Sequence, residues 1–256
     1  RRSSVVGARG AELPTPGVAA SLGSLGSRGA SCPPRTVYLH GMLPFPSATE
    51  LMRRLPRLFL GLVLFGIGVS MTLVAGLGVS PWTVFHEGVA EQTGIRIGTV
   101  VVITGLFVLL LWIPLRERIG IGSVANVLTI GPVINVTLDV LPEVVDVGWQ
   151  QWAYMLGGTF VVALGSGFYI GAGLGPGPRD GVMTGLARRG INIGVARIII
   201  EVTALTLGWL LGGTVGIGTV VFAFGVGPLI GMLLPRLQLE PVSDARHQTP
   251  DVRQDS

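Results

Sequence analysis

The chain of 256 residues has little charge, no lysine and a single cysteine. Charged residues make up 12% of it, against about 25% in an ordinary soluble domain, which excludes a soluble globular protein. Cys32 alone cannot form a disulfide framework or a cysteine-based metal site. All 18 basic residues are arginines, and those of the core lie beside apolar runs and not on a face with interleaved aromatics. We therefore expect no nucleic-acid partner.

Catalytic and cofactor signatures are missing as well. The chain has no His-Glu-x-x-His and no Gly-x-Ser-x-Gly pattern, and the glycine-rich run 171–177 lacks a Walker lysine. The motif Gly120-x-Gly122-x-x-Ala125 opens an apolar run with no strand before it, so it does not indicate a nucleotide site. We expect neither an enzyme nor a protein that holds a metal or cofactor.

What the chain does contain is apolar sequence. Hydrophobic residues make up 49% of it and the mean hydropathy is +0.66. Six apolar runs have a length suited to crossing a bilayer, and they cover residues 58–76, 97–115, 121–141, 152–174, 196–211 and 215–234. These continuous runs lack the alternation of barrel strands, so the sequence predicts an all-α polytopic membrane protein with six transmembrane helices over residues 42–236.

Both ends of the chain differ from this core. Residues 1–41 are rich in Gly, Ser, Ala, Pro and Arg and contain no apolar run. We expect a disordered extension, or an upstream segment read through a wrongly assigned start, with Met42 as the natural initiator. Residues 237–256 are polar and are expected to form a disordered cytoplasmic tail.

Four glycine motifs occur twice, 97 residues apart for the first and 96 apart for the other three. The pairs begin at Gly76 and Gly173, Gly94 and Gly190, Gly120 and Gly216, and Gly131 and Gly227. They define two repeats, about 57–141 and 152–235, with three apolar runs each. Because a three-span repeat enters the bilayer from opposite sides in its two copies, the sequence predicts an inverted repeat.

The charges indicate the orientation. Arginines precede the first run, lie between the second and third and between the fourth and fifth, and follow the sixth, whereas Arg96 alone falls on the other side. Under the positive-inside rule, both termini are cytoplasmic.

Each repeat also contains a short segment that begins with proline, at 81–94 and at 178–190. A proline at the first position of a helix is favourable, so we expect a short extra helix in each repeat. Such a helix can lie flat at the interface, which is the arrangement we expect, or dip into the protein as a re-entrant half-helix.

Small residues repeat every four positions in the first run of each half. They are Gly68, Thr72 and Gly76 in one, and Ala163, Gly167, Gly171 and Gly175 in the other. We expect these two helices to cross closely.

One Gly-Pro dipeptide interrupts the third run of each half, Gly131-Pro132 in the first and Gly227-Pro228 in the second. Matching interruptions in two halves point to a substrate site, although a packing kink explains them equally well.

Polar residues inside the spans are candidates for a substrate or ion pathway. They are Glu201, Arg197, Asn126, Asn135, Thr129 and Asp180. Glu201 follows Arg197 by one turn, so it is either part of a proton or ion relay or half of a local ion pair. The amides and Thr129 either line a pathway or bond between helices, and Asp180 either caps its helix or binds a cation.

Several of these residues resemble a known family, the YczE branch of the YitT-like bacterial membrane proteins. The similarity rests on 76–78 with Pro81-Trp82, on 112–116, Gly122 and Asn126, and in the second half on 175–181, Arg197, Glu201, 208–213 and 218–219. The chain departs from the pattern at Thr83, where the family usually has an acid, so Asp180 alone keeps the carboxylate. The resemblance implies a bacterial inner-membrane protein without an established activity.

Two functions fit these features. The first is a small-solute secondary transporter or permease with a site between the repeats, and the second is a membrane scaffold or assembly factor that transports nothing. In either case the lipid bilayer is the surrounding solvent, and a homodimer is compatible with the sequence.

Overall fold

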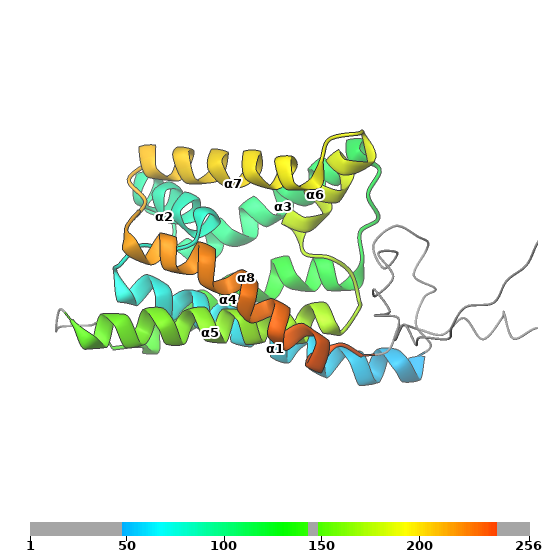
Figure 1. The fold of residues 1–256 in the computed structure, drawn as a ribbon, viewed down its shortest axis with the longest axis horizontal. Coiled ribbons are helices and arrows are strands. Elements are labelled where there is room, and N and C mark those ends of the chain that lie inside the picture. The colour runs from blue at the N-terminus through cyan, green and yellow to red at the C-terminus, as the bar shows by residue number, and fades with distance from the viewer. Residues whose placement is uncertain (1–47, 143–147, 240–256) are drawn as a thin grey trace, which may run out of the picture. The chain divides into compact units, whose positions relative to one another are not determined.

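The computed structural model describes residues 48–142 and 148–239, and these residues form eight α-helices and no strand (Figure 1). The helices are α1 (Ala48–Ala75), α2 (Pro81–Thr93), α3 (Ile97–Leu115), α4 (Ile121–Val140), α5 (Trp149–Gly171), α6 (Pro178–Arg188), α7 (Ile193–Leu210) and α8 (Ile217–Leu237). Six of them, all but α2 and α6, are long and apolar enough to cross a membrane. This confirms the all-α fold with six spans. The expectations for residues 1–41 and for most of the C-terminal tail lie outside the described residues.

Helix α1 begins at Ala48, ten residues before the first apolar run. The apolar face continues toward the N-terminus through Leu55 and Leu51, which pack against the core around the fully buried Leu58. Arg54 is buried here, and its guanidinium donates a hydrogen bond to the carbonyl oxygen of Ala172 at 3.0 Å. A charged side chain with a backbone acceptor is therefore compatible with the packed helix.

The first helices of the two halves, α1 and α5, cross closely, as the sequence predicts. A Cβ atom added to Gly61 would lie 2.7 Å from the carbonyl oxygen of Gly165, and one added to Gly68 would lie 2.8 Å from that of Gly158. Only glycine permits this approach of the backbones. The predicted contact residues are wrong in part, because Gly167 and Gly171 face Leu237 of α8 instead.

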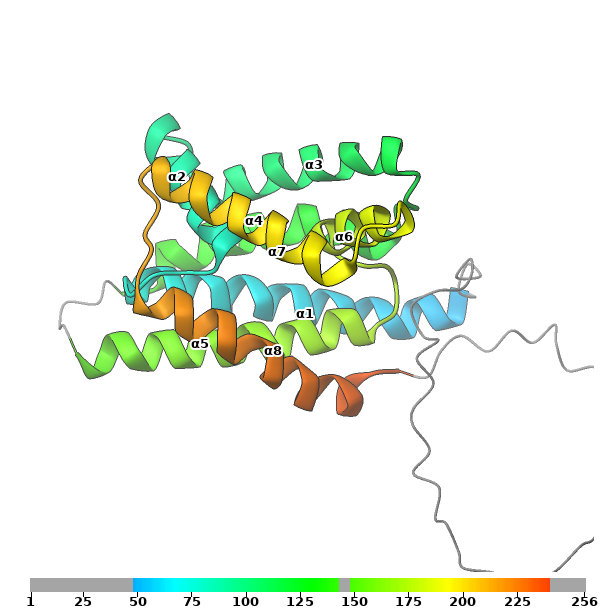
Figure 2. The same cartoon turned by 45° about the horizontal axis from the view of Figure 1, so that its top comes forward.

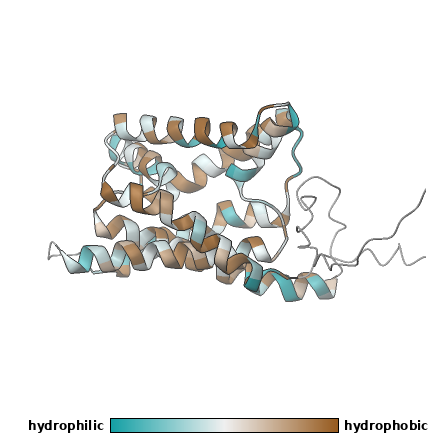
Figure 3. Cartoon of the chain, viewed as in Figure 1, coloured by the Kyte–Doolittle hydropathy of each residue, from teal (hydrophilic) through white to brown (hydrophobic). Residues whose placement is uncertain are grey.

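The helices are arranged in two layers (Figures 1 and 2). The first layer consists of α1, α4, α5 and α8, in which α1 packs on α5 and α4, and α5 packs on α8. The second consists of α2, α3, α6 and α7, in which α2 packs on α7 and α3, and α6 packs on α3 and α7. Figure 3 shows apolar residues over most of the long helices, with hydrophilic ones gathered at helix ends and on α6.

The two halves adopt positive φ angles at equivalent positions. Among the described residues, positive φ angles occur in four equivalent pairs and at Gly148, which lies between the halves. The pairs are Gly76 and Gly173 (63° and 66°), Gly78 and Gly175 (102° and 132°), Gly94 and Gly190 (68° and 90°), and Arg116 and Gly212 (55° and 99°). The turns that the sequence motifs encode are therefore built alike in both halves.

Two hydrogen bonds between the halves also occur at equivalent positions. The amide of Gly122, at the start of α4, donates to the carbonyl oxygen of Leu174 at 3.0 Å. At the equivalent positions, the amide of Gly218, at the start of α8, donates to the carbonyl oxygen of Leu77 at 2.7 Å. Each loop that precedes a short helix is thus held by the third long helix of the other half.

The expected helix breaks at Gly131-Pro132 and Gly227-Pro228 are not present. Helices α4 and α8 continue through both prolines, because a proline removes one backbone hydrogen bond and does not have to end a helix. The chain instead leaves helical geometry at 76–80 and 172–177, where the positive-φ glycines lie.

Candidate functional site

The short helices α2 and α6 come from different halves and bring their N-terminal ends toward one another. The Arg179 guanidinium, in the first turn of α6, lies over the ring of Trp82 in the first turn of α2, at 5.7 Å from the ring centroid. Both helices also pack along long helices of the opposite half, α2 on α7 and α6 on α3. This arrangement favours the re-entrant alternative over the flat interfacial helix that we expected.

The ends of the two short helices are capped differently. The Ser80 hydroxyl oxygen accepts a hydrogen bond from the Thr83 amide at 3.3 Å and lies 2.7 Å from the Thr83 hydroxyl. Gly177, at the equivalent position of α6, offers no side chain, so the α6 end has no side-chain cap. The helix dipole therefore presents a partial positive charge at α6 beside Arg179.

The rings of Trp82, Phe85 and His86 lie close together on α2. The His86 ring lies 6.2 Å from the ring of Trp82 and 6.0 Å from that of Phe85, measured between centroids. Burial and, to a smaller extent, the positive charge of Arg179 together lower the pKa of His86 to about 3, so the imidazole is neutral at neutral pH. The indole nitrogen of Trp82 is buried and has no hydrogen-bond partner among the described residues, which leaves one donor unsatisfied.

Polar groups of the first layer meet the α6 end. The Tyr169 hydroxyl of α5 donates to an Asp180 carboxylate oxygen at 3.4 Å. A Cβ atom on Gly177 would lie 3.0 Å from the Tyr169 hydroxyl, 3.3 Å from that carboxylate and 3.9 Å from the Asn126 amide nitrogen of α4. The small Gly177 therefore leaves room for these side chains to converge between the layers. We call Trp82, His86, Tyr169, Arg179, Asp180 and Asn126 the central cluster.

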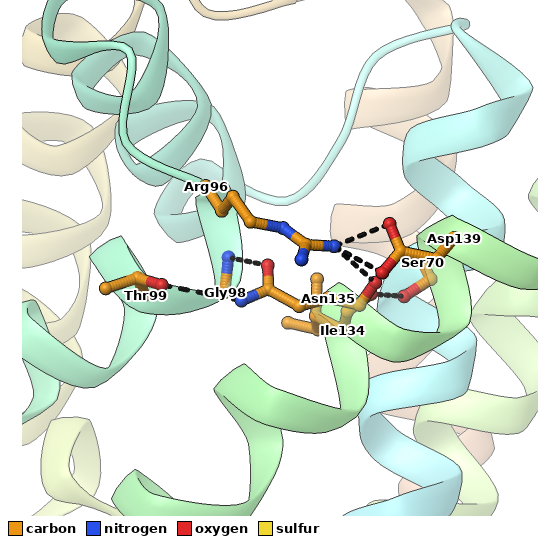
Figure 4. A network of polar contacts seen from close by, with 7 residues as sticks. All are labelled: Ser70, Arg96, Gly98, Thr99, Ile134, Asn135 and Asp139. Atoms are coloured by element: carbon orange, nitrogen blue, oxygen red, sulfur yellow. Dashed lines mark hydrogen bonds and ion pairs between the residues drawn. The ribbon is translucent and has the colours of Figure 1, made fainter.

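Two of the six predicted pathway residues, Asn126 and Asp180, lie in this cluster. Asn135 lies elsewhere, at the end of the bundle that holds Arg96, in a network that joins α3 to α4 (Figure 4). Its side-chain oxygen accepts from the Gly98 amide at 2.9 Å, and its nitrogen donates to the Thr99 hydroxyl at 3.4 Å. It therefore bonds between helices, which is one of the two alternatives that we considered.

The remaining three predicted residues are dispersed. Thr129 lines a shallow apolar groove of about 510 Å³ between α1 and α4, together with Phe59 and Leu128. Glu201 is half-buried and Arg197 exposed on α7, and within residues 48–142 and 148–239 neither forms an ion pair or a hydrogen bond. The local ion pair considered for them is thus not formed in this structure.

Sequence reasoning missed four members of the central cluster. Tyr169 and Arg179 flank the glycine-rich motif at 171–177, and Trp82 follows the matching motif, so proximity to the repeated loops was the available signal. His86 belongs to no recognised sequence pattern, and its ring is half-buried beside Trp82. No pattern in the sequence predicts that Arg179 reaches Trp82, because this contact arises only when the two halves pack.

Comparison with known proteins places the chain in a family without an established activity. A family model described as a family of unknown function (DUF6198) matches residues 52–235. An uncharacterized protein of Haemophilus influenzae is 35% identical over 178 residues, which cover 69% of this chain and 81% of the relative.

Two relatives come from Bacillus subtilis. The uncharacterized membrane protein YczE is 33% identical over 190 residues, covering 73% of this chain and 88% of YczE. The uncharacterized protein YyaS is 23% identical over 194 residues, covering 73% and 95% respectively. No solved structure matches the chain. With six membrane-length helices and these relatives, the chain is an integral membrane protein that belongs to the DUF6198 family, the family of YczE and YyaS.

Proposed function

We propose that the protein is a permease for a small polar solute, which binds at the central cluster. The observation that carries the proposal is the meeting of the α2 and α6 N-terminal ends, from opposite halves, at Arg179 and Trp82. Discontinuous helices whose N-terminal ends face a midplane site are the recurring design of inverted-repeat transporters. The equivalent turns and exchanged hydrogen bonds of the two halves support an inverted repeat.

The chemistry of the cluster suits a solute with a hydrogen-bond-accepting or anionic group. Arg179 has no carboxylate within ion-pair distance among the described residues, and Trp82 retains an unused N–H. A guanidinium at membrane depth is costly unless a partner or water neutralises it, so a bound solute would supply what the protein does not. Asp180, which is exposed, is available to a donor group of the same solute.

We further propose that both termini face the cytoplasm of a bacterial cell. In this orientation the loop at Arg96 is external, and the loop at Arg188 and Arg189 is cytoplasmic. The asymmetric distribution of arginine supports it.

The test is uptake into proteoliposomes by the wild type, Arg179→Gln and the control Arg118→Gln, whose side chain is exposed and has no partner among the described residues. Uptake of a solute that falls at least tenfold in Arg179→Gln and persists in Arg118→Gln supports the permease. If no solute class is taken up by the wild type, the scaffold alternative replaces it. If both variants transport equally, the central cluster is not the site.

A further inference from the structure

Helices of the second layer pack on α4 of the first layer but not on its equivalent, α8. Helix α3 packs on α4, whereas the equivalent pair, α7 and α8, is not packed, and α6 touches α4 whereas α2 is not packed on α8. Every other packed pair of helices in the described part of the chain has its equivalent in the other half. The second layer therefore leans on α4 and away from α8.

Glycines show the same difference at atomic distance. A Cβ atom on Gly98 would overlap the carbonyl oxygen of Gly131, and one on Gly131 would overlap that of Gly98. At the equivalent positions, Gly227 has no heavy atom within 4 Å of its added Cβ, and Gly194 meets only the side chain of Asn192 at 3.2 Å. The chain thus keeps on α7 and α8 the two glycines that a close crossing needs, although the crossing is not made.

Polar contacts stabilise the packing of α3 on α4. An Arg96 nitrogen lies 2.5 Å from the Asp139 carboxylate and donates to the Asn135 carbonyl oxygen at 3.1 Å (Figure 4). The equivalent of Asp139 on α8 is Pro235, which has no carboxylate, and the equivalent of Arg96 is Asn192, which has no guanidinium. Closure of α7 on α8 must therefore depend on a different group.

The second layer is tied together across the halves, so that its helices can move as a unit. The Trp112 indole of α3 donates to the Pro178 carbonyl oxygen of α6 at 2.9 Å. The Glu87 carboxylate of α2 accepts from the Thr214 amide, beyond the end of α7, at 2.7 Å. The loops that join the layers, 76–80 and 172–177, contain the positive-φ glycines and can act as hinges.

If α7 crossed α8 as α3 crosses α4, Glu201 would lie against α8. Its equivalent in the first half is Gly105, whose added Cβ would lie 3.0 Å from the nearest side-chain atoms of Val127. The equivalent of Val127 on α8 is Ala223, so the second half pairs a larger residue on α7 with a smaller one on α8. Closing α7 on α8 would bury the Glu201 carboxylate beside an alanine, which is costly unless the carboxylate is protonated.

We infer that the second layer rocks between α4 and α8, and that protonation of Glu201 permits α7 to close on α8. In the second state Gly194 meets Gly227 and α3 leaves α4, so that α7 and α8 come together while α3 and α4 separate. As a transport step this inference rests on the proposed function, although the motion itself does not require it. It names Glu201 as a coupling residue that acts through helix packing.

The charged and titratable groups on elements around α7 are few. Helix α7 itself carries Arg197, α2 carries His86, Glu87 and Glu91, and α6 carries Arg179, Asp180, Arg188 and Arg189. None of them forms an ion pair with Glu201 in this structure. No neighbouring positive charge therefore neutralises the Glu201 carboxylate, and protonation is what removes its charge.

Pulsed EPR distances in proteoliposomes test the inference, with Cys32 replaced by serine. One label pair, at Ile199 and Phe224, reports α7–α8, and the equivalent pair, at Ile103 and Leu128, reports α3–α4; all four residues are exposed. As pH falls from 8 to 5, we expect the population of molecules with a short α7–α8 distance to increase. The population with a short α3–α4 distance should decrease to the same extent. Glu201→Gln should populate the short α7–α8 distance at every pH, and Glu201→Asp should keep the pH dependence.

Each result decides the matter. If neither distance changes in any variant, the rocking motion is wrong, even if the protein transports a solute. If both change but Glu201→Gln responds to pH as the wild type does, the coupling role of Glu201 is wrong. Because the distances are measured without solute, a failed uptake screen would overturn the permease and leave this inference standing.

Discussion

Alanine at Gly98 and alanine at Gly194 are the same substitution at equivalent positions of the two halves, yet we expect opposite effects. At Gly98 the new methyl group overlaps the Gly131 carbonyl oxygen, and at Gly194 it meets only the Asn192 side chain at 3.2 Å. Overpacking costs about 1–3 kcal/mol, whereas alanine in place of glycine inside a helix gains about 1 kcal/mol in propensity. The net change is then about 0–2 kcal/mol of destabilisation at Gly98 and up to about 1 kcal/mol of stabilisation at Gly194.

The assay is thermal unfolding in detergent, followed by tryptophan fluorescence. For a chain of this size, 1 kcal/mol corresponds to about 2–4 °C, so Gly98→Ala should melt at least a few degrees below Gly194→Ala. Gly194→Ala should nevertheless slow any transport, because it obstructs the crossing of α7 on α8 in the second state. Equal melting temperatures for the two variants would refute the packing argument.

Three further predictions concern the central cluster and the crossing of the halves. Because the pKa of His86 is lowered to about 3 from 6.5, its contribution to stability is complete above pH 6.5 and declines as pH falls toward 3; His86→Gln should flatten the melting temperature over that range. Asp180→Asn keeps the contact with Tyr169 and should reduce solute affinity without lowering the melting temperature. Gly165→Val places a branched side chain against the α1 backbone, and gel filtration should show aggregated protein, whereas Gly227→Val should remain monodisperse.

Much of the fold follows from the sequence because lipid imposes simple conditions on it. Long apolar runs must form helices, and the glycine motifs at 76 and 173 mark turns that the structure builds with nearly equal φ angles. Helix ends were less predictable, as at α1, which begins ten residues before the apolar run and includes the buried Arg54. Prolines 132 and 228 also proved to be poor markers of helix breaks.

The site was only partly accessible to sequence reasoning. Asn126 and Asp180 were found because they are polar residues in or beside apolar runs, and both lie in the central cluster. The contact of Arg179 with Trp82 depends on the tertiary meeting of two short helices, which no local pattern encodes. The unequal packing of the halves could not be foreseen either, since both carry the same glycines.

The central claim is that the two halves cross the membrane in opposite directions and meet at the cluster. Ile95 and Ile191 are exposed residues at equivalent positions in the loops that follow α2 and α6. Cysteines at these positions, in a chain with Cys32→Ser, can be labelled in intact cells with a membrane-impermeant maleimide. The account predicts labelling of the cysteine at 95 from outside and of that at 191 only after the membrane is opened. Labelling of both from the same side would contradict it.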